Sequence, residues 1–228
     1  MAFPGAATVI VAHGAWADGS SWSEVILPLE ERGLGVIAAP LPLTSLRDDA
    51  AALERVIART GGPLVLAAHA YSGAVIAAAG DPRVKALVYV AALAPDEGET
   101  VAQVFYRDAP HPLAPRLAPD KDGLIWMPEE GFSNAFAQHA TAEQIAIARA
   151  VQRPLAVACI QEPSPAPAWR RKPSWYLLAE EDRMISPVTQ SFMATRMKAT
   201  IRTHKVDHTP LLTAPSKVVD VIIEAANA

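Results

Sequence analysis

The residues best placed to do chemistry lie around a short stretch at positions 64–76. Apolar residues 64–68 predict a buried strand, and the alanine-rich residues after position 72 predict a helix. A tight strand-to-helix turn of this kind lifts the side chain at its apex clear of the sheet, where acyl-transfer enzymes carry a serine. Here the apex is Ala70, and the small residues Ala68 and Ser72 flank it. The sequence therefore predicts a reactive site with an alanine at the nucleophile position.

Two later residues have the types that would serve such a nucleophile, an acid and a base. Asp182 follows the apolar run 174–179, and His208 follows the run 200–206. Parallel sheets place functional groups in the loops at the carboxyl ends of their strands, so we expect both side chains beside Ala70. Nucleophile, acid and histidine in this chain order form one of the known catalytic triads. Glu180 and Glu181 compete with Asp182 for the acid's role, and a lone acid or histidine can be purely structural.

Backbone N–H groups are expected to complete the site as donors to a developing oxyanion. Tyr71 directly follows the apex, and Ala15 lies in the loop after the first predicted strand, with Gly14 letting the chain turn towards the site. The aromatic residues Trp16 and Trp126 predict that the site binds an apolar or aromatic substrate. The two tryptophans would serve equally well as packing residues of their own segments.

The apolar runs predict the sheet that must hold these loops. Strands are predicted at residues 8–12, 36–39, 64–68, 84–92, 174–179 and 200–206, and helices through residue 32 (with Ser20 or Ser21 as N-cap), at 48–59, after 72, and at 141–151, 187–198 and 216–226. This alternation indicates an α/β fold with a roughly six-stranded, mainly parallel sheet flanked by helices. Between residues 95 and 172 the strand pattern disappears and prolines gather, which predicts an inserted helical cap. The core would comprise residues 1–94 and 173–228 of a single domain.

Composition narrows the classes of protein and partner. Of the 228 residues, 51% are hydrophobic and 19% charged, which is typical of a globular protein. The net charge of −4, without a basic stripe, argues against nucleic acid as a partner. The apolar runs are far shorter than the roughly 20 residues that span a bilayer, so no membrane partner is expected. The single cysteine, Cys159, excludes an internal disulfide and favours a cytoplasmic location. No metal-ligand spacing or dinucleotide motif occurs, so neither metal nor cofactor is predicted.

Several segments together resemble the α/β-hydrolase superfamily, and within it the branch of small bacterial esterases and plant hydroxynitrile lyases. The likeness rests on residues 14–22, 88–99, 174–176 and 181–185. It implies the α/β-hydrolase fold and a triad at Ala70, Asp182 and His208, which favours Asp182 over its glutamate neighbours. Lyases of this branch carry threonine at the position of Gly14 and lysine at that of Thr209. Because both lyase markers are missing, the resemblance implies esterase-like hydrolysis of a small ester or lactone-like molecule, by a monomer or homodimer.

Ala70 departs from the family pattern, in which the turn usually reads Gly-His-Ser-Tyr-Gly-Gly. Our preferred hypothesis is that alanine replaces a natural serine by engineering, because the predicted acid, base and aromatic loop are all present. The alternatives are a natural pseudoenzyme that binds a small molecule without turning it over, and a cofactor-free lyase or oxygenase on the same fold. Ser72 is not expected to substitute, since two residues along a helix rotate its hydroxyl by roughly 200°. Alanine at this apex is also expected to be strained.

Overall fold

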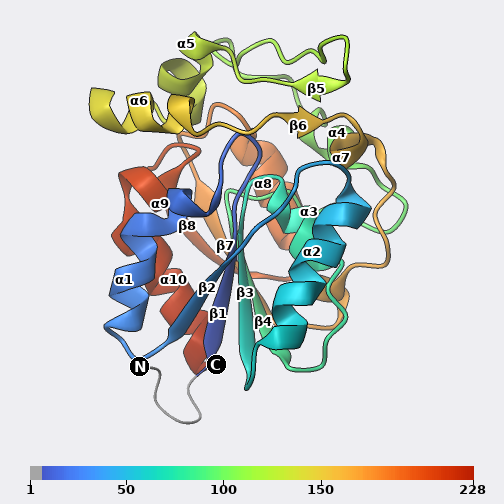
Figure 1. The fold of residues 1–228 in the computed structure, drawn as a ribbon, viewed down its shortest axis with the longest axis vertical. Coiled ribbons are helices and arrows are strands. Elements are labelled where there is room, and N and C mark those ends of the chain that lie inside the picture. Colours follow the sequence, from blue (N-terminus) through green and yellow to red (C-terminus); the bar gives the residue numbers. More distant parts are fainter. Residues whose placement is uncertain (1–6) are drawn as a thin grey trace.

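Six parallel strands form the sheet that carries the predicted loops (Figure 1). The structure is a computed structural model that describes residues 7–228. In spatial order the strands are β2 (Gly35–Ala39), β1 (Thr8–Ala12), β3 (Leu64–His69), β4 (Val84–Val90), β7 (Ser174–Ala179) and β8 (Thr200–His204). Every neighbouring pair is parallel, with β3 and β4 at the centre. The predicted fold class is therefore confirmed, and the carboxyl ends of all six strands meet at one edge.

Helices cover both faces of the sheet and bury two separate apolar cores. On one face lie α1 (Ser23–Glu30) and α10 (Pro215–Asn227), which pack against each other. On the sheet, α1 contacts β2 and α10 contacts β4 and β7. On the other face lie α2 (Leu46–Arg59), α3 (Ser72–Ala77) and α8 (Pro187–Arg196). Figure 1 shows α1 and α10 on one side of the sheet and α2 and α3 on the other. Because β3 is buried along its whole length between these layers, its carboxyl end is a rigid base for a site.

Short elements between β4 and β7 lie over the carboxyl edge of the sheet, and we call residues 95–172 the cap (Figure 1). They are α4 (Val101–Phe105), β5 (Leu124–Ile125), α5 (Glu129–Gly131), a π-helical turn (Phe132–Phe136), α6 (Ala142–Ala150), β6 (Leu155–Ala156), α7 (Ala158–Gln161) and a 3₁₀ turn (Ala168–Arg170). The antiparallel pair β5–β6 was not expected in a cap predicted as helical. Two-residue strands are too short to produce a readable alternation. The division into core and cap stays a prediction, and residues 1–6 lie outside the described range.

Local details correct two further expectations. Neither Ser20 nor Ser21 caps the first helix: a 3₁₀ turn (Gly19–Trp22) precedes α1, and the Asp18 carboxylate caps that turn by accepting the Ser20 N–H at 2.8 Å. The strands β4 and β8 end two residues earlier than predicted, at Val90 and His204. Their last apolar residues instead enter the loops that build the site. Among residues 7–228, no helix has the length and apolar character to cross a bilayer.

Candidate active site

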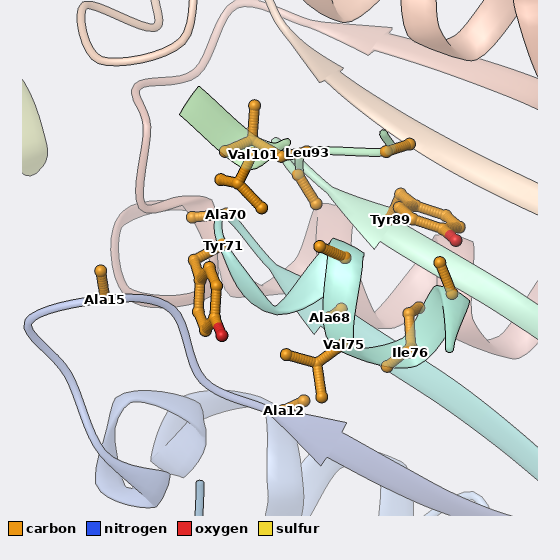
Figure 2. Close-up of a cluster of buried hydrophobic side chains, with 14 of the residues drawn as sticks. Ala12, Ala15, Ala68, Ala70, Tyr71, Val75, Ile76, Tyr89, Leu93 and Val101 are labelled. Carbon is orange, nitrogen blue, oxygen red and sulfur yellow. The ribbon is translucent and has the colours of Figure 1, made fainter. Parts of the chain in front are cut away.

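The turn between β3 and α3 is a tight elbow with Ala70 at its apex (Figure 2). Ala70 has φ 50°, in the left-handed region that costs a non-glycine residue about 1–2 kcal/mol. Backbone hydrogen bonds hold it there, because the Ala70 N–H donates to Val90 O at 3.3 Å and Ala70 O accepts the Leu93 N–H at 2.9 Å. The strain expected at the apex is thus present and is balanced by pairing with the loop after β4.

Small residues around the apex are required by close backbone approach. A Cβ on Gly73 would overlap the Leu93 carbonyl oxygen. A Cβ on Gly14 would lie 3.1 Å from the Ala70 methyl and 2.9 Å from His69 Nδ1. The loop after β1 therefore passes directly against the elbow. The fully buried Ser72 hydroxyl donates to the carbonyls of Ala12 and His69, at 2.8 and 2.9 Å, so it is engaged away from the site as expected.

The structure brings Asp182 and His208 into direct contact. His208 Nδ1 lies 2.8 Å from Asp182 Oδ2, and both residues are almost fully buried. Asp182 Oδ1 accepts the N–H groups of Met184 and Ile185 at 2.7 and 2.8 Å, which fixes the carboxylate. The side-chain amide of Gln190 donates to Oδ2 at 2.8 Å. When His208 Nδ1 carries the proton and donates it to the Asp182 carboxylate, Nε2 is left as the acceptor, which is the state that a general base needs.

The neighbouring acids take other roles. Glu180 and Glu181 are exposed, and Glu181 pairs with His139 of the cap at 3.1 Å. Asp207 is a turn carboxylate: its Oδ1 accepts the Thr209 N–H at 3.2 Å and its Oδ2 accepts the His139 backbone N–H at 3.0 Å. Of the candidate acids, only Asp182 contacts the imidazole.

Ala70, His208, Ala15 and Tyr71 all line one cavity of about 50 Å³. Among residues 7–228, no group hydrogen bonds to His208 Nε2 or to the backbone N–H of Ala15 or Tyr71. The residues that carry a free imidazole nitrogen and two free backbone N–H groups therefore line the same small space as Ala70. A substrate carbonyl could accept from those N–H groups while its carbon lies beside position 70. The remaining walls are apolar and come mostly from the cap: Val101, Ala102, Phe105, Tyr106, Leu117, Ile125, Leu155, Ile160 and, from the loop after β7, Met184.

The two tryptophans proposed for substrate binding lie in different places. Trp16, with φ 58°, lines the cavity, and its indole N–H donates to the carbonyl of Ile125 in the cap at 2.9 Å. Trp126 is 45% exposed, donates instead to Asp120 at 3.2 Å, and does not line the cavity. Trp126 lies outside the cavity because in this extended segment Ile125 points inward and the next side chain points outward. A role for Trp126 in substrate binding stays a prediction.

A second, larger cleft of about 230 Å³ lies on the other side of Trp16. Trp16 and Phe136 pack edge to face, 6.3 Å between ring centroids, and Phe136 packs against His208. Both aromatic residues line the cleft, and Trp16 also lines the smaller cavity beside Ala70. The outer cleft is walled by Ile147 and Val151 of the cap and by the polar 3₁₀ turn. Trp16 is therefore the partition between two spaces.

His69 supports the base from behind rather than facing substrate. It is fully buried, and its Nε2 lies 2.7 Å from the His208 carbonyl oxygen, to which it donates. Burial, and then the neighbouring His208, lower the pKa of His69 well below its ordinary value, so the ring stays neutral. The bond of His69 to the His208 carbonyl had no signal in the sequence spacing.

The cap also fastens the two loops that carry the acid and the base. The Thr209 hydroxyl donates to Phe136 O at 2.6 Å, and the Gln138 amide donates to Glu181 O at 2.7 Å.

Burial raises the pKa of the Cys159 thiol in α7 to about 12, so this cysteine is not a nucleophile at neutral pH. Within residues 7–228 no cluster of His, Cys, Asp and Glu side chains has the arrangement of a metal site.

A comparison with models of protein families identifies the family of this chain. Residues 9–221 match the description "Alpha/beta hydrolase family". The chain belongs to the alpha/beta hydrolase family. Among solved structures, this hydrolase is similar to polyneuridine aldehyde esterase (15% identity, TM-score 0.83, 96% of this chain and 98% of that chain). It is also similar to a pyrethroid hydrolase from Sphingobium faniae JZ-2 (20% identity, TM-score 0.83, 98% of both chains).

A third similar structure is a variant of methylketone synthase I from tomato, at 14% identity and TM-score 0.84, covering 97% of this hydrolase and 98% of that chain. A search of curated protein sequences gave no significant match. At sequence identities this low, the structural similarity establishes the shared fold alone. The chemistry of this hydrolase has to be argued from its own residues.

Proposed function

We propose that this hydrolase has the site of a serine esterase, in a form whose nucleophile position is alanine. The observation that carries the proposal is the contact of Asp182 with His208 Nδ1 at 2.8 Å, with the free Nε2 in the same cavity as Ala70. A base whose proton partner is buried and fixed, beside two unpaired N–H donors, is the arrangement that acyl transfer requires.

With a hydroxyl at position 70, each group has a definite task. The hydroxyl oxygen attacks the acyl carbon while its proton passes to His208 Nε2, and Asp182 stabilises the resulting imidazolium. The carbonyl electrons move onto the oxygen, which the N–H groups of Ala15 and Tyr71 hold. His208 then protonates the departing alcohol, and a water repeats the sequence to release the acid. No cofactor or metal takes part.

The cavity walls indicate the class of substrate. They are almost entirely apolar apart from the base and the two N–H donors, so the site is suited to a small apolar or aromatic ester or lactone. The outer cleft beyond Trp16 offers room for a larger apolar group if the indole moves. We expect the protein to act in the cytoplasm as a monomer or homodimer, without nucleic acid or membrane partners.

The alanine makes this chain inactive or nearly so. Loss of one triad member typically leaves only about 10³–10⁴-fold acceleration over water, from the donors and binding alone. We favour engineered replacement of a serine, because a left-handed, strained apex and an intact acid–base pair are costly features that a serine would use. The alternatives are a natural pseudoenzyme that binds a small molecule without turning it over, and a cofactor-free lyase or oxygenase in which His208 acts directly on the bound molecule. The unengaged Nε2 is the observation that favours the lyase or oxygenase.

The substitution Ala70→Ser tests the proposal. Hydrolysis of p-nitrophenyl acetate should rise by at least about 10³-fold over the unchanged chain, because the nucleophile restores covalent catalysis. The unchanged chain is the control for background hydrolysis. A folded Ala70→Ser protein that remains as inert as this chain would sink the esterase proposal. Turnover of a non-ester ligand by the unchanged chain would instead establish the lyase or oxygenase.

A further inference from the structure

A second buried carboxylate lies behind the elbow and has no role in the steps above. Asp49, in the first turn of α2, is fully buried and forms no salt bridge with any basic residue among residues 7–228. Its Oδ2 accepts the Tyr71 phenolic hydroxyl at 2.7 Å, and its Oδ1 accepts the Leu43 N–H at 2.7 Å. The Cys159 thiol of the cap lies 3.7 Å from Oδ2. A carboxylate enclosed by neutral donors in this way is expensive to bury.

A helix-capping role does not explain Asp49. The Ser45 hydroxyl already caps α2 by accepting the Asp48 N–H at 3.0 Å. Asp48 is the exposed acid of that first turn, and it accepts the Thr44 hydroxyl at 2.8 Å. Asp49 instead points away from its own helix end and into the space between α2, the elbow and the cap. The contacts that its carboxylate makes in this space, rather than helix capping, therefore explain why an acidic residue stands at position 49.

The contact with Tyr71 bears directly on the oxyanion site. Tyr71 follows the apex, and its backbone N–H is one of the two free donors in the cavity. Figure 2 shows its ring extending away from Ala70, with the hydroxyl at the far end. Tyr71 is the N-cap residue of α3, but its side chain forms no capping hydrogen bond with that helix. The bond from the phenol to the Asp49 carboxylate therefore anchors the far end of this side chain.

We propose that Asp49 is a positioning residue for the oxyanion site: by holding the Tyr71 hydroxyl, it fixes the direction of the Tyr71 backbone N–H. This inference rests on the proposed esterase function. The carboxylate does not stabilise the oxyanion by charge, since both are negative, so its effect is on orientation. Because Cys159 contacts the same carboxylate and Ile160 lines the cavity, the anchor also joins the cap to the donor.

The test compares variants in the Ala70→Ser protein. Tyr71→Phe removes only the hydroxyl. Asp49→Asn replaces one carboxylate oxygen by an amide NH₂ group, which cannot accept the hydrogen bonds that surround this side chain. Both should lower kcat for p-nitrophenyl acetate by about 10- to 100-fold with KM nearly unchanged, because a small misplacement of a donor weakens the transition state more than the ground state. Tyr176→Phe is the matched control, since its buried hydroxyl donates to Ala92 O at 2.6 Å, outside the cavity lining.

The outcomes separate the two levels of the argument. If Tyr71→Phe and Asp49→Asn lower the thermal midpoint as Tyr176→Phe does while kcat stays within about twofold, the network is only structural and the inference is overturned. A drop in kcat in both variants and not in Tyr176→Phe supports it. If Asp49→Asn does not fold, Tyr71→Phe alone decides. An inert Ala70→Ser protein would overturn the esterase proposal itself, and the positioning role with it.

Discussion

The loops at the carboxyl edge of the sheet and the cap above them enclose the same cavity by different means. The edge loops supply the polar groups, and short hydrogen bonds fix each one, as in the 2.8 Å contact between Asp182 and His208. The cap supplies mainly apolar walls from two- to nine-residue elements, and α6 has no fully buried residue. The difference teaches that the core fixes the polar groups of the site, whereas the apolar walls come mainly from the cap together with Trp16 of the core.

The largest effect should come from removing the base. In the Ala70→Ser protein, His208→Ala should lower kcat/KM for p-nitrophenyl acetate by about 10³–10⁴-fold, because the hydroxyl loses its proton acceptor. His139→Ala is the matched control, since His139 is an exposed cap histidine paired with Glu181. Steady-state kinetics of the two variants measure the difference. Equal losses in both would show that the edge loops and the cap do not divide the work as argued.

The next effect concerns packing at the elbow. Gly73→Ala should lower the free energy of unfolding by about 3 kcal/mol, because its Cβ would overlap the Leu93 carbonyl oxygen and the backbone would have to shift. Gly61→Ala has open space around the added methyl and should be neutral or stabilising by about 0.5 kcal/mol. Urea unfolding measures both. A Gly73→Ala protein as stable as Gly61→Ala would mean that the elbow is not tightly packed.

The preference for larger substrates should change when Trp16, which lines both cavities, is removed. In the Ala70→Ser background, Trp16→Ala should raise the preference for p-nitrophenyl hexanoate over acetate by about tenfold, since it joins the cavity to the outer cleft. The effect corresponds to burying roughly two methylene groups. Trp126→Ala, which removes an exposed indole, should leave the ratio within about twofold. An unchanged ratio in Trp16→Ala would show that the two spaces do not communicate.

The smallest effect is the pH dependence set by His69. Because burial lowers its folded pKa well below the unfolded value of 6.5, the unfolded chain binds more protons as pH falls below 6.5. Stability from this group is fully present above pH 6.5 and is lost on acidification. His69→Gln, which keeps a side-chain N–H, should show a smaller loss of unfolding free energy between pH 7 and pH 5. The exposed His111→Gln serves as control, and an identical slope in all three proteins would contradict this assignment.

The comparison between edge and cap also explains how much the sequence could predict. The six strands, the elbow at Ala70 and the pairing partners Asp182 and His208 follow from apolar runs and from the loops after them. Long periodic segments carry this information locally. The same logic predicted that the Ser72 hydroxyl would be turned away from the site, and the structure agrees.

Other features depend on contacts between distant segments and had no local signal. The outward position of Trp126, directly after the two-residue strand β5, could not be read from its sequence neighbours. The bond of His69 to the His208 carbonyl spans 139 residues, and the contact of Asp49 with Cys159 spans 110. Asp48 and Asp49 are both acids in the first turn of α2, and nothing in the sequence distinguishes them. Tertiary packing alone decides that the Asp49 carboxylate faces Tyr71.

The central claim is that position 70 is the nucleophile position, in line with His208 and the two N–H donors. It is tested most directly by intact-mass spectrometry after treatment with an alkyl fluorophosphonate, which phosphonylates activated serines with loss of fluoride. We predict one adduct per chain in Ala70→Ser, mapped to residue 70, no adduct in the unchanged chain, and loss of labelling when His208→Ala is added. A folded Ala70→Ser protein that stays unlabelled, or a label on Ser72, would contradict the account.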